Sequence, residues 1–383
     1  MTTSSPFVFV GARGPSGEGD PAPYLRRAFS VGHGLRRAEL VVTALGVLEA
    51  YVNGERLSDE VLAPGWTSYR HRVVARRHDV TALLAPGENV VGAVVGEGWA
   101  VGALTWENIR HNYVDRPALF ARLELVYDDR TEFVGTDGEV RVGTGAVLSS
   151  GIYAGEAHDA RAEPLGWAAP GFDDSSWERA VEVPWDAATV VVDDTPPIHR
   201  TEELAPVAIT TSPSGRPIVD FGQNISGRLR LTVSGEAGTT ITLRHAELLT
   251  PAGELETETL RSAAATDRYT LRGGGPESWE PRFTFHGFRY AEVDGWPGEL
   301  RAESLRAVVV HSEMTRTGWF ETSNPLVTKL HENTVWSMRD NFVGVPTDCP
   351  QRDERLGWTG DLNAFAPTAT FLYDVRGVLG SWL

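Results

Sequence analysis

The sequence predicts a multidomain, mainly β protein in which two β-sandwich regions are followed by an α-helical segment. A chain of 383 residues is too long for one ordinary hydrophobic core. Its 40 glycines and 23 prolines indicate many turns, and short apolar or alternating runs separated by turn residues fill most of its length. After Met314, apolar residues instead recur at helical spacing.

The first β-sandwich is predicted over residues 1–185. The run "RRAELVVTALGVLEAYVNGERL" turns at Asn53-Gly54, a pair that favours a two-residue hairpin. "NVVGAVVGEGW" reads as a buried strand, and "ALFARLELVYDDRTEFVGTDG" as a hairpin that turns near Asp129. The glycines of "GEGWAVG" lack the spacing and the following helix of a dinucleotide loop, so we expect a β-turn there.

The second β-sandwich is predicted over residues 186–312, after a proline-containing linker. "LRLTVSGEAGTTITLRHAE" is an alternating strand, a glycine turn and a second alternating strand. In "DFGQNISGRL", Gln223 and Asn224 are either satisfying backbone groups of a strand connection, which we favour, or contacting a ligand.

The helical segment is predicted over residues 313–383. Asn324 is a favourable N-cap and Pro325 suits the first helical position. "DLNAFAPTATFLYD" and "VRGVLGSWL" read as two further helices, with Pro367 tolerated only near a helix start or kink. The apolar stripe of the first helix is Leu326, Leu330, Val335, Met338 and Phe342.

Composition excludes several classes of function. The net charge of −17 argues against nucleic acid and anionic membranes as partners. The single cysteine, Cys349, excludes an intrachain disulfide, and neither a second thiol nor an H-E-x-x-H motif supports a zinc site. The N-terminal "MTTSSPFVFVGARG" lacks a signal-peptide pattern and no run is long enough to span a membrane, so we expect a cytoplasmic protein.

Residues 345–361, "VPTDCPQRDERLGWTGD", concentrate the charged residues that could do chemistry. A glycosidase needs one carboxylic acid that holds its proton and one carboxylate that activates water, and a tryptophan offers a sugar an apolar face. Composition alone leaves open a charged structural loop, and it favours Cys349 as a buried structural residue over a nucleophile. The carboxylates are Asp348, Asp353, Glu354 and Asp361, and they alternate with Arg352, Arg355 and Trp358.

The stretch from "VPTDCPQRDERLGWTGD" to the terminal "SWL" resembles the motif that opens the catalytic domain of bacterial α-L-rhamnosidases of glycoside hydrolase family 78. Upstream, "LAPGWTSYRHR", "GEAHDAR", "DFGQNISGRLRL", "ATDRYTLRG" and "FTFHGFRYAEV" resemble the accessory β-domains of that family, in the same order. Two positions depart from its pattern: Ala100 stands where many relatives have tyrosine, and Ala154 interrupts a "YDGE"-like stretch.

The resemblance implies hydrolysis of terminal non-reducing α-L-rhamnosyl residues by an inverting acid–base mechanism. It makes Glu354 the general acid, and it has Asp348 and Asp361 contact the sugar hydroxyls. Trp358 packs against the deoxysugar, and Arg352 is an orienting partner. The expected substrate is a small-molecule or oligosaccharide rhamnoside, and a homodimer is left open. We map no calcium ligands of that family onto this sequence and expect neither metal nor cofactor.

The resemblance also implies that the helical segment begins an (α/α)6 barrel whose general base lies far downstream. Twelve helices with their loops need roughly 200 residues, whereas residues 313–383 number 71. We therefore expect a C-terminally truncated chain with an incomplete barrel that is inactive alone. The alternative is a non-catalytic carbohydrate-binding fragment that recognises rhamnose through its β-domains.

Overall fold

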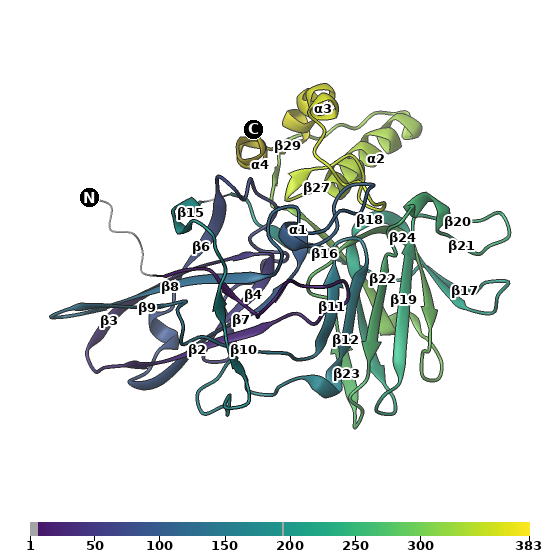
Figure 1. The fold of residues 1–383 in the computed structure, drawn as a ribbon. Helices are drawn as coiled ribbons and strands as arrows, with labels where there is room; N and C mark the ends of the chain where they lie inside the picture. Colours follow the sequence, from purple (N-terminus) through teal and green to yellow (C-terminus); the bar gives the residue numbers. More distant parts are fainter. Residues whose placement is uncertain (1–6, 194) are drawn as a thin grey trace. The chain divides into compact units, whose positions relative to one another are not determined.

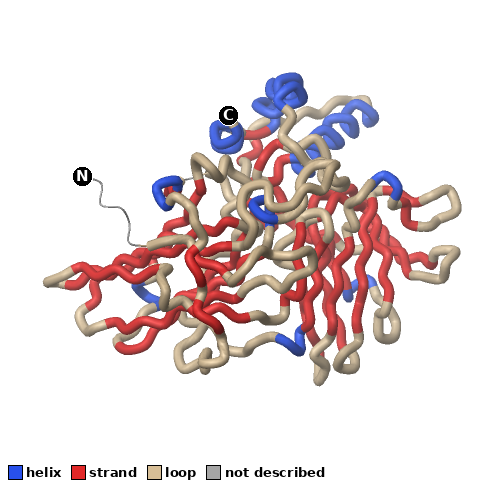
Figure 2. Tube along the Cα trace, in the orientation of Figure 1, coloured by secondary structure: helices blue, strands red, loops and turns tan. Residues whose placement is uncertain are grey.

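The computed structural model describes residues 7–193 and 195–383. The first six residues of the predicted 1–185 region, which also begin the stretch read for a signal peptide, lie outside the described residues. The chain is mainly β-strand and divides into two compact units (Figures 1 and 2). None of the helices in the described part of the chain is long and apolar enough to cross a membrane. The units are Met1–Gly102, Arg110–Ser150 and Ala162–Asp193 for the first, and Ala103–Ile109, Gly151–Arg161 and Asp194–Leu383 for the second.

The first unit contains two sheets whose inner faces share one hydrophobic core, as in a sandwich. Leu25 and Val91 of one sheet and Leu40 and Leu123 of the other lie in this core. One sheet has the order β14 (Val181–Glu182), β1 (Val10–Gly11), β8 (Ala118–Tyr127), β3 (Leu35–Leu45), β6 (Val73–Asp79), β15 (Val190–Val192), with β9 (Thr131–Gly135) on β8. The other has the order β13 (Glu178–Arg179), β10 (Arg141–Gly143), β2 (Tyr24–Val31), β7 (Gly87–Gly96), β4 (Val47–Val52), β5 (Glu55–Arg56).

Local sequence predicted the hairpins of this unit correctly. Val52 pairs with Glu55 across Asn53-Gly54, and both turn residues have the positive φ of a type I′ turn, 51° and 86°. The second predicted hairpin is β8–β9, where Val126 pairs with Thr131. The "GEGWAVG" segment differs from the expected β-turn, because it forms one helical turn, α1 (Gly98–Val101).

The second unit is built on a larger sheet, drawn in teal and green in Figure 1. Strand β18 organises it, because this long strand pairs with four neighbours along its length. The strand order is β12 (Gly155–Asp159), β22 (Thr266–Thr270), β19 (Thr240–Ala246), β24 (His286–Asp294), β18 (Pro217–Ser234), β25 (Leu305–Ser312), β16 (Ile198–Leu204), with β17 (Ala208–Thr211) and β23 (Pro276–Trp279) also on β18. Strand β11 (Val147–Gly151) carries the chain from one unit into the other.

The strands predicted for this unit form, although their pairing is not evident from sequence. The two strands of "LRLTVSGEAGTTITLRHAE" are the end of β18 and β19, which pair with other partners rather than with each other. The "DFGQN" stretch is a register shift within β18 rather than a connection between strands. There the Gln223 side chain donates to the Asn224 carbonyl oxygen at 2.8 Å, and the side-chain Nδ2 of Asn224 donates to Glu247 Oε1 at 2.7 Å.

The helices of residues 313–383 belong to the second unit and are yellow in Figure 1. They are α2 (Pro325–Asn341), α3 (Thr359–Leu372) and α4 (Arg376–Trp382). The predicted cap is confirmed, because the Asn324 side chain accepts a hydrogen bond from the Leu326 amide at 3.0 Å. Pro367 lies inside α3 and not near its start; Asn363, whose carbonyl loses its helical partner, is exposed and can bond to water.

The apolar stripe predicted for α2 divides into a buried and an exposed part. Val335, Met338 and Phe342 are buried in a small core with α3 and α4, whereas Leu326 and Leu330 are 79% and 64% exposed.

Three short strand pairs complete the unit: β20 (Leu248–Leu249) with β21 (Leu255–Glu256), β26 (Thr315–Arg316) with β29 (Tyr373–Asp374), and β27 (Phe342–Val343) with β28 (Val345–Pro346). The predicted mainly β, sandwich-like architecture is confirmed, while the boundaries at 186 and 313 stay predictions. Short 3-10 turns are η1 (Thr81–Leu83), η2 (Ala160–Ala162), η3 (Ala187–Thr189), η4 (Glu258–Leu260) and η5 (Ala302–Ser304).

Candidate active site

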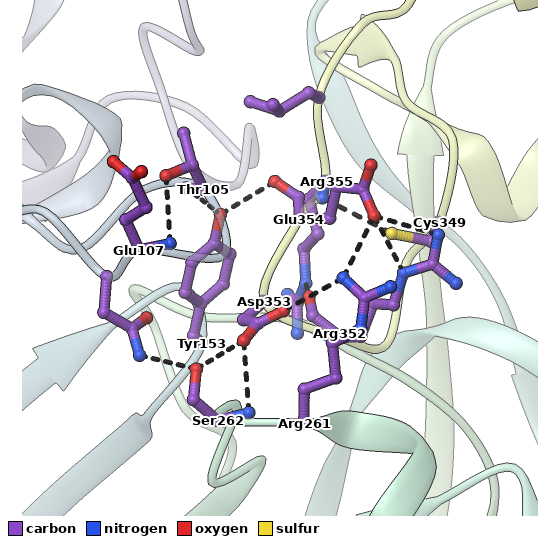
Figure 3. Close-up of polar contacts among 12 residues, drawn as sticks. Thr105, Glu107, Tyr153, Arg261, Ser262, Cys349, Arg352, Asp353, Glu354 and Arg355 are labelled. Atoms are coloured by element: carbon purple, nitrogen blue, oxygen red, sulfur yellow. Dashed lines mark hydrogen bonds and ion pairs between the residues drawn. The ribbon is translucent and has the colours of Figure 1, made fainter.

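The charged stretch predicted from sequence forms the loop between β28 and α3 in the second unit (Figure 3). Its tip packs against the sheet at a glycine: a Cβ on Gly287 of β24 would lie 2.8 Å from Pro350 and 2.9 Å from Gln351. Such distances are shorter than a Cβ tolerates, so the close approach of loop and sheet depends on glycine. Gly287, within the "HGF" stretch of β24, therefore allows the loop to pack directly on the sheet.

Arg355 fixes this loop from inside. Its side chain is 1% exposed and lies between the rings of Tyr153 and Phe285, 5.2 and 4.9 Å from their centroids. Nη1 donates to the carbonyl oxygens of Ile152 and Phe285 at 3.0 and 2.8 Å. Nε donates to the Arg352 carbonyl at 2.9 Å. Burial lowers the pKa of Arg355 to about 10, so the group remains charged at neutral pH.

Glu354 stands beside this anchor, and its carboxylate is held by Arg352 and Arg261, which Figure 3 shows, and by Trp358. Oε1 accepts a hydrogen bond from Trp358 Nε1 at 3.1 Å. Oε2 accepts from Arg352 Nε at 3.1 Å and from Arg261 Nη1 at 3.3 Å. The carboxylate is therefore oriented from both sides, while its side chain stays 13% exposed and open to a ligand.

Arg352 connects Glu354 to Asp348. Its Nη2 lies 3.0 Å from Glu354 Oε2 and donates to Asp348 Oδ2 at 3.0 Å. The other oxygen of Asp348 accepts from the Leu356 amide at 3.0 Å, which closes the loop on itself. The predicted partnership of Arg352 with the carboxylates is therefore present, whereas Arg355 binds main-chain carbonyls instead of carboxylates.

Asp353 faces the sheet side of the loop and is buried. Its Oδ2 accepts hydrogen bonds from the Ser262 hydroxyl at 2.5 Å and from the Ser262 amide at 3.2 Å. Arg261, the neighbour of Ser262, lies 3.6 Å from Asp353 Oδ1 and 3.3 Å from Glu354 Oε2. One turn, after η4, thus contacts both acids of the "DER" triplet.

A second support comes from the segment 151–161. The Tyr153 hydroxyl donates to the Glu354 carbonyl oxygen at 2.9 Å and accepts from the Thr105 amide at 3.0 Å. Burial raises the pKa of Tyr153 to about 12, so the hydroxyl keeps its proton. Gly155, at φ 105°, allows the chain to pass the Thr266 carbonyl oxygen, which would lie 2.1 Å from a Cβ.

A hollow of about 590 Å³, including space open to solvent, lies between α2 and α3, and Glu354 reaches it only through its hydrogen-bond partner Trp358, which lines it. Three predicted sugar-contacting residues, Asp348, Trp358 and Asp361, line it. Its remaining wall is polar and apolar in patches, a composition suited to a deoxysugar with hydroxyls on one side and a methyl group. The other lining residues are Ser337, Met338, Asn341, Phe342, Pro346, Thr347, Leu362 and Phe365.

Four non-glycine residues around this cluster have a left-handed backbone, which L residues rarely adopt. Their φ values are 63° for Thr105, 52° for Asn108, 57° for Arg261 and 44° for Arg355. Unfavourable backbone of this kind persists where surrounding contacts hold it, and it gathers at functional sites. The strain therefore marks the same place as the hydrogen bonds.

Cys349 lies in this loop as a buried free thiol, in agreement with the structural interpretation. Burial raises its pKa to about 12, so it is neither an activated nucleophile nor a thiolate ligand at neutral pH. Asp348, Cys349 and Glu354 bring ligand atoms within 4.8 Å of one another, but Arg352 already occupies both carboxylates. The chemistry of this donor set does not favour a metal.

A second cluster with metal-ligating side chains lies buried in the sheet, formed by His245, Asp267 and His286. His286 Nε2 is 3.0 Å from Asp267 Oδ2, and the His245 ring stacks on the His286 ring with centroids 4.2 Å apart and planes at 25°. An imidazole binds metal in its ring plane, so stacked rings do not converge on one ion. Burial would raise the pKa of Asp267, but the charge and hydrogen bond of His286 lower it overall. The cluster is a polar element of the core.

Sequence reasoning missed the residues that support the loop from elsewhere in the chain: Tyr153, Arg261, Ser262 and, as described below, Trp106. Only Tyr153 had a signal, as part of the stretch compared with "YDGE". Asp361 lines the hollow with Asp348 and Trp358 but has no hydrogen bond to Glu354 among the described contacts.

Two β-sheet units followed by helices, with a carboxylate–arginine–tryptophan cluster, are typical of modular carbohydrate-active proteins. Three family profiles match consecutive parts of the chain. They are the α-L-rhamnosidase N-terminal domain at 33–202, the bacterial α-L-rhamnosidase concanavalin-like domain at 210–311, and the bacterial α-L-rhamnosidase 6 hairpin glycosidase domain at 315–383. The chain belongs to the bacterial α-L-rhamnosidase family.

Individual relatives agree with this assignment. The α-L-rhamnosidase of Streptomyces avermitilis is 46% identical over 365 residues, which are 94% of this chain and 35% of the relative. The crystal structure of the Aspergillus terreus enzyme has a TM-score of 0.94 at 44% identity, over 98% of this chain and 44% of that one. The S. avermitilis structure in complex with L-rhamnose has a TM-score of 0.91 at 45% identity, over 95% and 36%. The chain thus spans less than half the length of these relatives.

Proposed function

We propose that the protein is an α-L-rhamnosidase that hydrolyses terminal non-reducing α-L-rhamnosyl residues, with Glu354 as the general acid. The observation that carries this proposal is the set of contacts of Glu354: its carboxylate is held by Arg352 and by Trp358, which lines a hollow together with Asp348 and Asp361. Membership of the family and the L-rhamnose complex of a 45% identical structure support a rhamnoside as substrate.

In the proposed reaction Glu354 gives its proton to the glycosidic oxygen while the bond from that oxygen to the anomeric carbon breaks. Water attacks the opposite face of the sugar ring and gives its proton to a base, so the configuration inverts. Asp348 and Asp361 would bind sugar hydroxyls, and Trp358 would pack against the sugar's apolar face. The residues of the loop supply the acid.

The hydrogen bonds of Glu354 set a condition for this role. Both of its oxygens accept bonds from nitrogen donors, an arrangement that suits the ionised group. Among the described contacts Oε1 accepts from Trp358 alone and so keeps a lone pair that can hold the proton, whereas Oε2 accepts from both Arg352 and Arg261.

We also propose that α2, α3 and α4 are helices of an (α/α)6 barrel. The match of residues 315–383 to a 6 hairpin glycosidase profile supports this arrangement, and the pairing of α2 with α3 and α4 around a shared core is compatible with it.

The test is the substitution Glu354→Gln in the whole protein, assayed on two rhamnosides. Methyl α-L-rhamnoside has a poor leaving group that needs a proton, whereas 2,4-dinitrophenyl α-L-rhamnoside has one that leaves without it. We expect kcat on the methyl glycoside to fall about 10²–10⁴-fold and kcat on the dinitrophenyl glycoside to fall far less. Glu332→Gln, on the exposed side of α2, is the matched control.

Near-normal turnover of the methyl glycoside by the Glu354→Gln protein would remove Glu354 from the acid role. NMR of the first sugar released tests the stereochemistry separately, since inversion gives β-L-rhamnose from an α-glycoside. Initial release of α-L-rhamnose would contradict inversion without affecting the assignment of the acid.

A further inference from the structure

Trp106 is an exposed aromatic residue that belongs to the second unit through the short segment Ala103–Ile109. Its indole is 50% exposed, and it stacks on that of Trp358 with ring planes within 6° and centroids 6.2 Å apart. Trp358 itself is 42% exposed. Two parallel, half-exposed indoles beside an acid form an apolar surface that folding alone does not require.

Both flanks of Trp106 are fastened to groups that also hold the "DER" acids. On one side the Thr105 amide donates to the Tyr153 hydroxyl, which donates to the Glu354 carbonyl oxygen. On the other side the Asn108 amide group donates to the Ser262 hydroxyl at 2.5 Å, and this hydroxyl donates to Asp353.

The segment is also closed on itself. The Leu104 amide donates to the Ile109 carbonyl oxygen at 3.0 Å, and Thr105 and Asn108 both hold a left-handed backbone within that closed turn. The position of Trp106 is therefore coupled to that of Glu354 by short hydrogen-bonded connections rather than left to a free loop.

The position of Trp106 relative to the hollow indicates which part of a substrate it would contact. Trp358 lines the hollow that would take the rhamnosyl ring, whereas Trp106 is not among the residues that line it. Trp358 Nε1 also donates to Glu354 Oε1, so the Trp358 ring lies next to the oxygen that would carry the proton. The glycosidic oxygen that receives this proton is attached to the leaving group. A surface that continues from Trp358 away from the hollow therefore meets the leaving group.

We propose that Trp106 is a specificity-determining residue that stacks with a planar aromatic aglycone of the rhamnoside. This inference rests on the proposed function, because it takes Glu354 as the acid and the hollow as the site of the rhamnosyl ring. Indole offers a flat apolar face to an aromatic ring, and Trp106 remains 50% exposed beside Trp358.

The experiment compares a flavonol rhamnoside with methyl α-L-rhamnoside in the whole protein and in Trp106→Ala and Trp106→Phe variants. The ratio of kcat/KM for the flavonol rhamnoside to that for the methyl glycoside should fall about three- to ten-fold in Trp106→Ala, mainly through KM. Phenylalanine should restore most of the ratio. Trp319→Ala, which removes a 71% exposed tryptophan of the same unit, is the control and should leave the ratio unchanged.

An unchanged ratio in Trp106→Ala, with the protein folded as judged by its thermal unfolding, would overturn the proposal. A similar fall for a rhamnosyl disaccharide and no fall for the flavonol would overturn the aromatic assignment in favour of a sugar. If the wild-type protein hydrolyses neither glycoside even when it contains the complete barrel, the proposed function fails. Calorimetric titration with the free flavonol then decides on Trp106 alone: loss of binding in Trp106→Ala supports the platform, and equal binding refutes it.

Discussion

The Tyr153 hydroxyl donates a hydrogen bond to the main-chain carbonyl oxygen of Glu354, 2.9 Å away and 201 residues later in the sequence. The same hydroxyl accepts a hydrogen bond from the Thr105 amide. A single phenol thus connects the acid of the loop to the segment that carries Trp106. Because the contact reaches the Glu354 backbone, Tyr153 is a positioning residue, and its removal should displace the carboxylate without changing its chemistry.

We predict that Tyr153→Phe lowers the free energy of unfolding by about 1–3 kcal/mol, because a carbonyl and an amide that are both partly buried lose their partner. We also expect kcat/KM on a rhamnoside to fall about ten-fold, since a small displacement of the acid weakens proton transfer. Denaturant unfolding and steady-state kinetics measure the two effects.

Tyr51→Phe is the matched control for this substitution. It removes a tyrosine hydroxyl that donates to Glu49 at 2.9 Å in the first unit. This variant should show unchanged kinetics. A Tyr153→Phe protein that loses stability but keeps its full kcat/KM would restrict Tyr153 to a structural role.

Arg355 is the basis of a second prediction. The substitution Arg355→Lys keeps the positive charge. Lysine has one nitrogen where arginine donates from three, so it cannot reach the carbonyls of Ile152, Phe285 and Arg352 together. We expect a loss on the order of 3 kcal/mol in the free energy of unfolding, because buried carbonyls remain unpaired. Urea unfolding at neutral pH measures it.

Arg352→Lys, in the same loop, provides the comparison. Arg352 is 30% exposed, so its replacement should cost little stability while it weakens the hold on Glu354 and Asp348. Equal losses of stability in the two variants would contradict the distinction between a buried anchor and an exposed orienting residue.

That distinction shows where sequence reasoning reached its limit. The "RDER" letters place two arginines among acids, and nothing in their spacing tells that Arg352 faces carboxylates while Arg355 faces carbonyls. The direction depends on Phe285 and Ile152, which reach the loop only through the fold of the sheet. Residues adjacent in sequence could be assigned to the site, whereas residues brought in by topology could not.

The fold shows the same division. The start of α2 at Asn324 and the Asn53-Gly54 hairpin were predictable because a cap or a turn is decided by a few neighbouring residues. The partners of β18 and β19 were not, since pairing between distant strands depends on the whole sheet. No local sequence pattern marks Trp106 as a site residue. Its proposed role depends on its stacking with Trp358, which lies 252 residues later in the sequence.

Asp340 of α2 makes stability depend on pH in a direction that is unusual for an aspartate. Burial raises its pKa to about 8, against the hydrogen bond from the Ser226 amide and the charge of Arg339, which lower it. The folded protein therefore holds this proton between about pH 4 and pH 8, where the unfolded chain has lost it. Stability from this group is complete at low pH and is lost as the pH rises through about 8.

We predict that Asp340→Asn removes this loss. Asparagine stays neutral and still offers an oxygen to the Ser226 amide, so its free energy of unfolding should gain on that of the wild type as the pH rises from 5 to 8. The gain is at most about 1.4 kcal/mol per pH unit. Urea unfolding of both proteins at each pH gives the difference, in which the contribution of Glu156, whose pKa burial raises to about 7, cancels.

Asp374→Asn is the control of opposite sign. The pKa of Asp374 is lowered to about 2 by its hydrogen bonds with Arg376, so its stabilising contribution is complete above pH 4 and lost only in acid. Its replacement should leave the slope between pH 5 and pH 8 as in the wild type. A pH-independent difference between Asp340→Asn and the wild type over that range would mean that Asp340 is ionised in the folded protein, and that the Ser226 amide and Arg339 outweigh its burial.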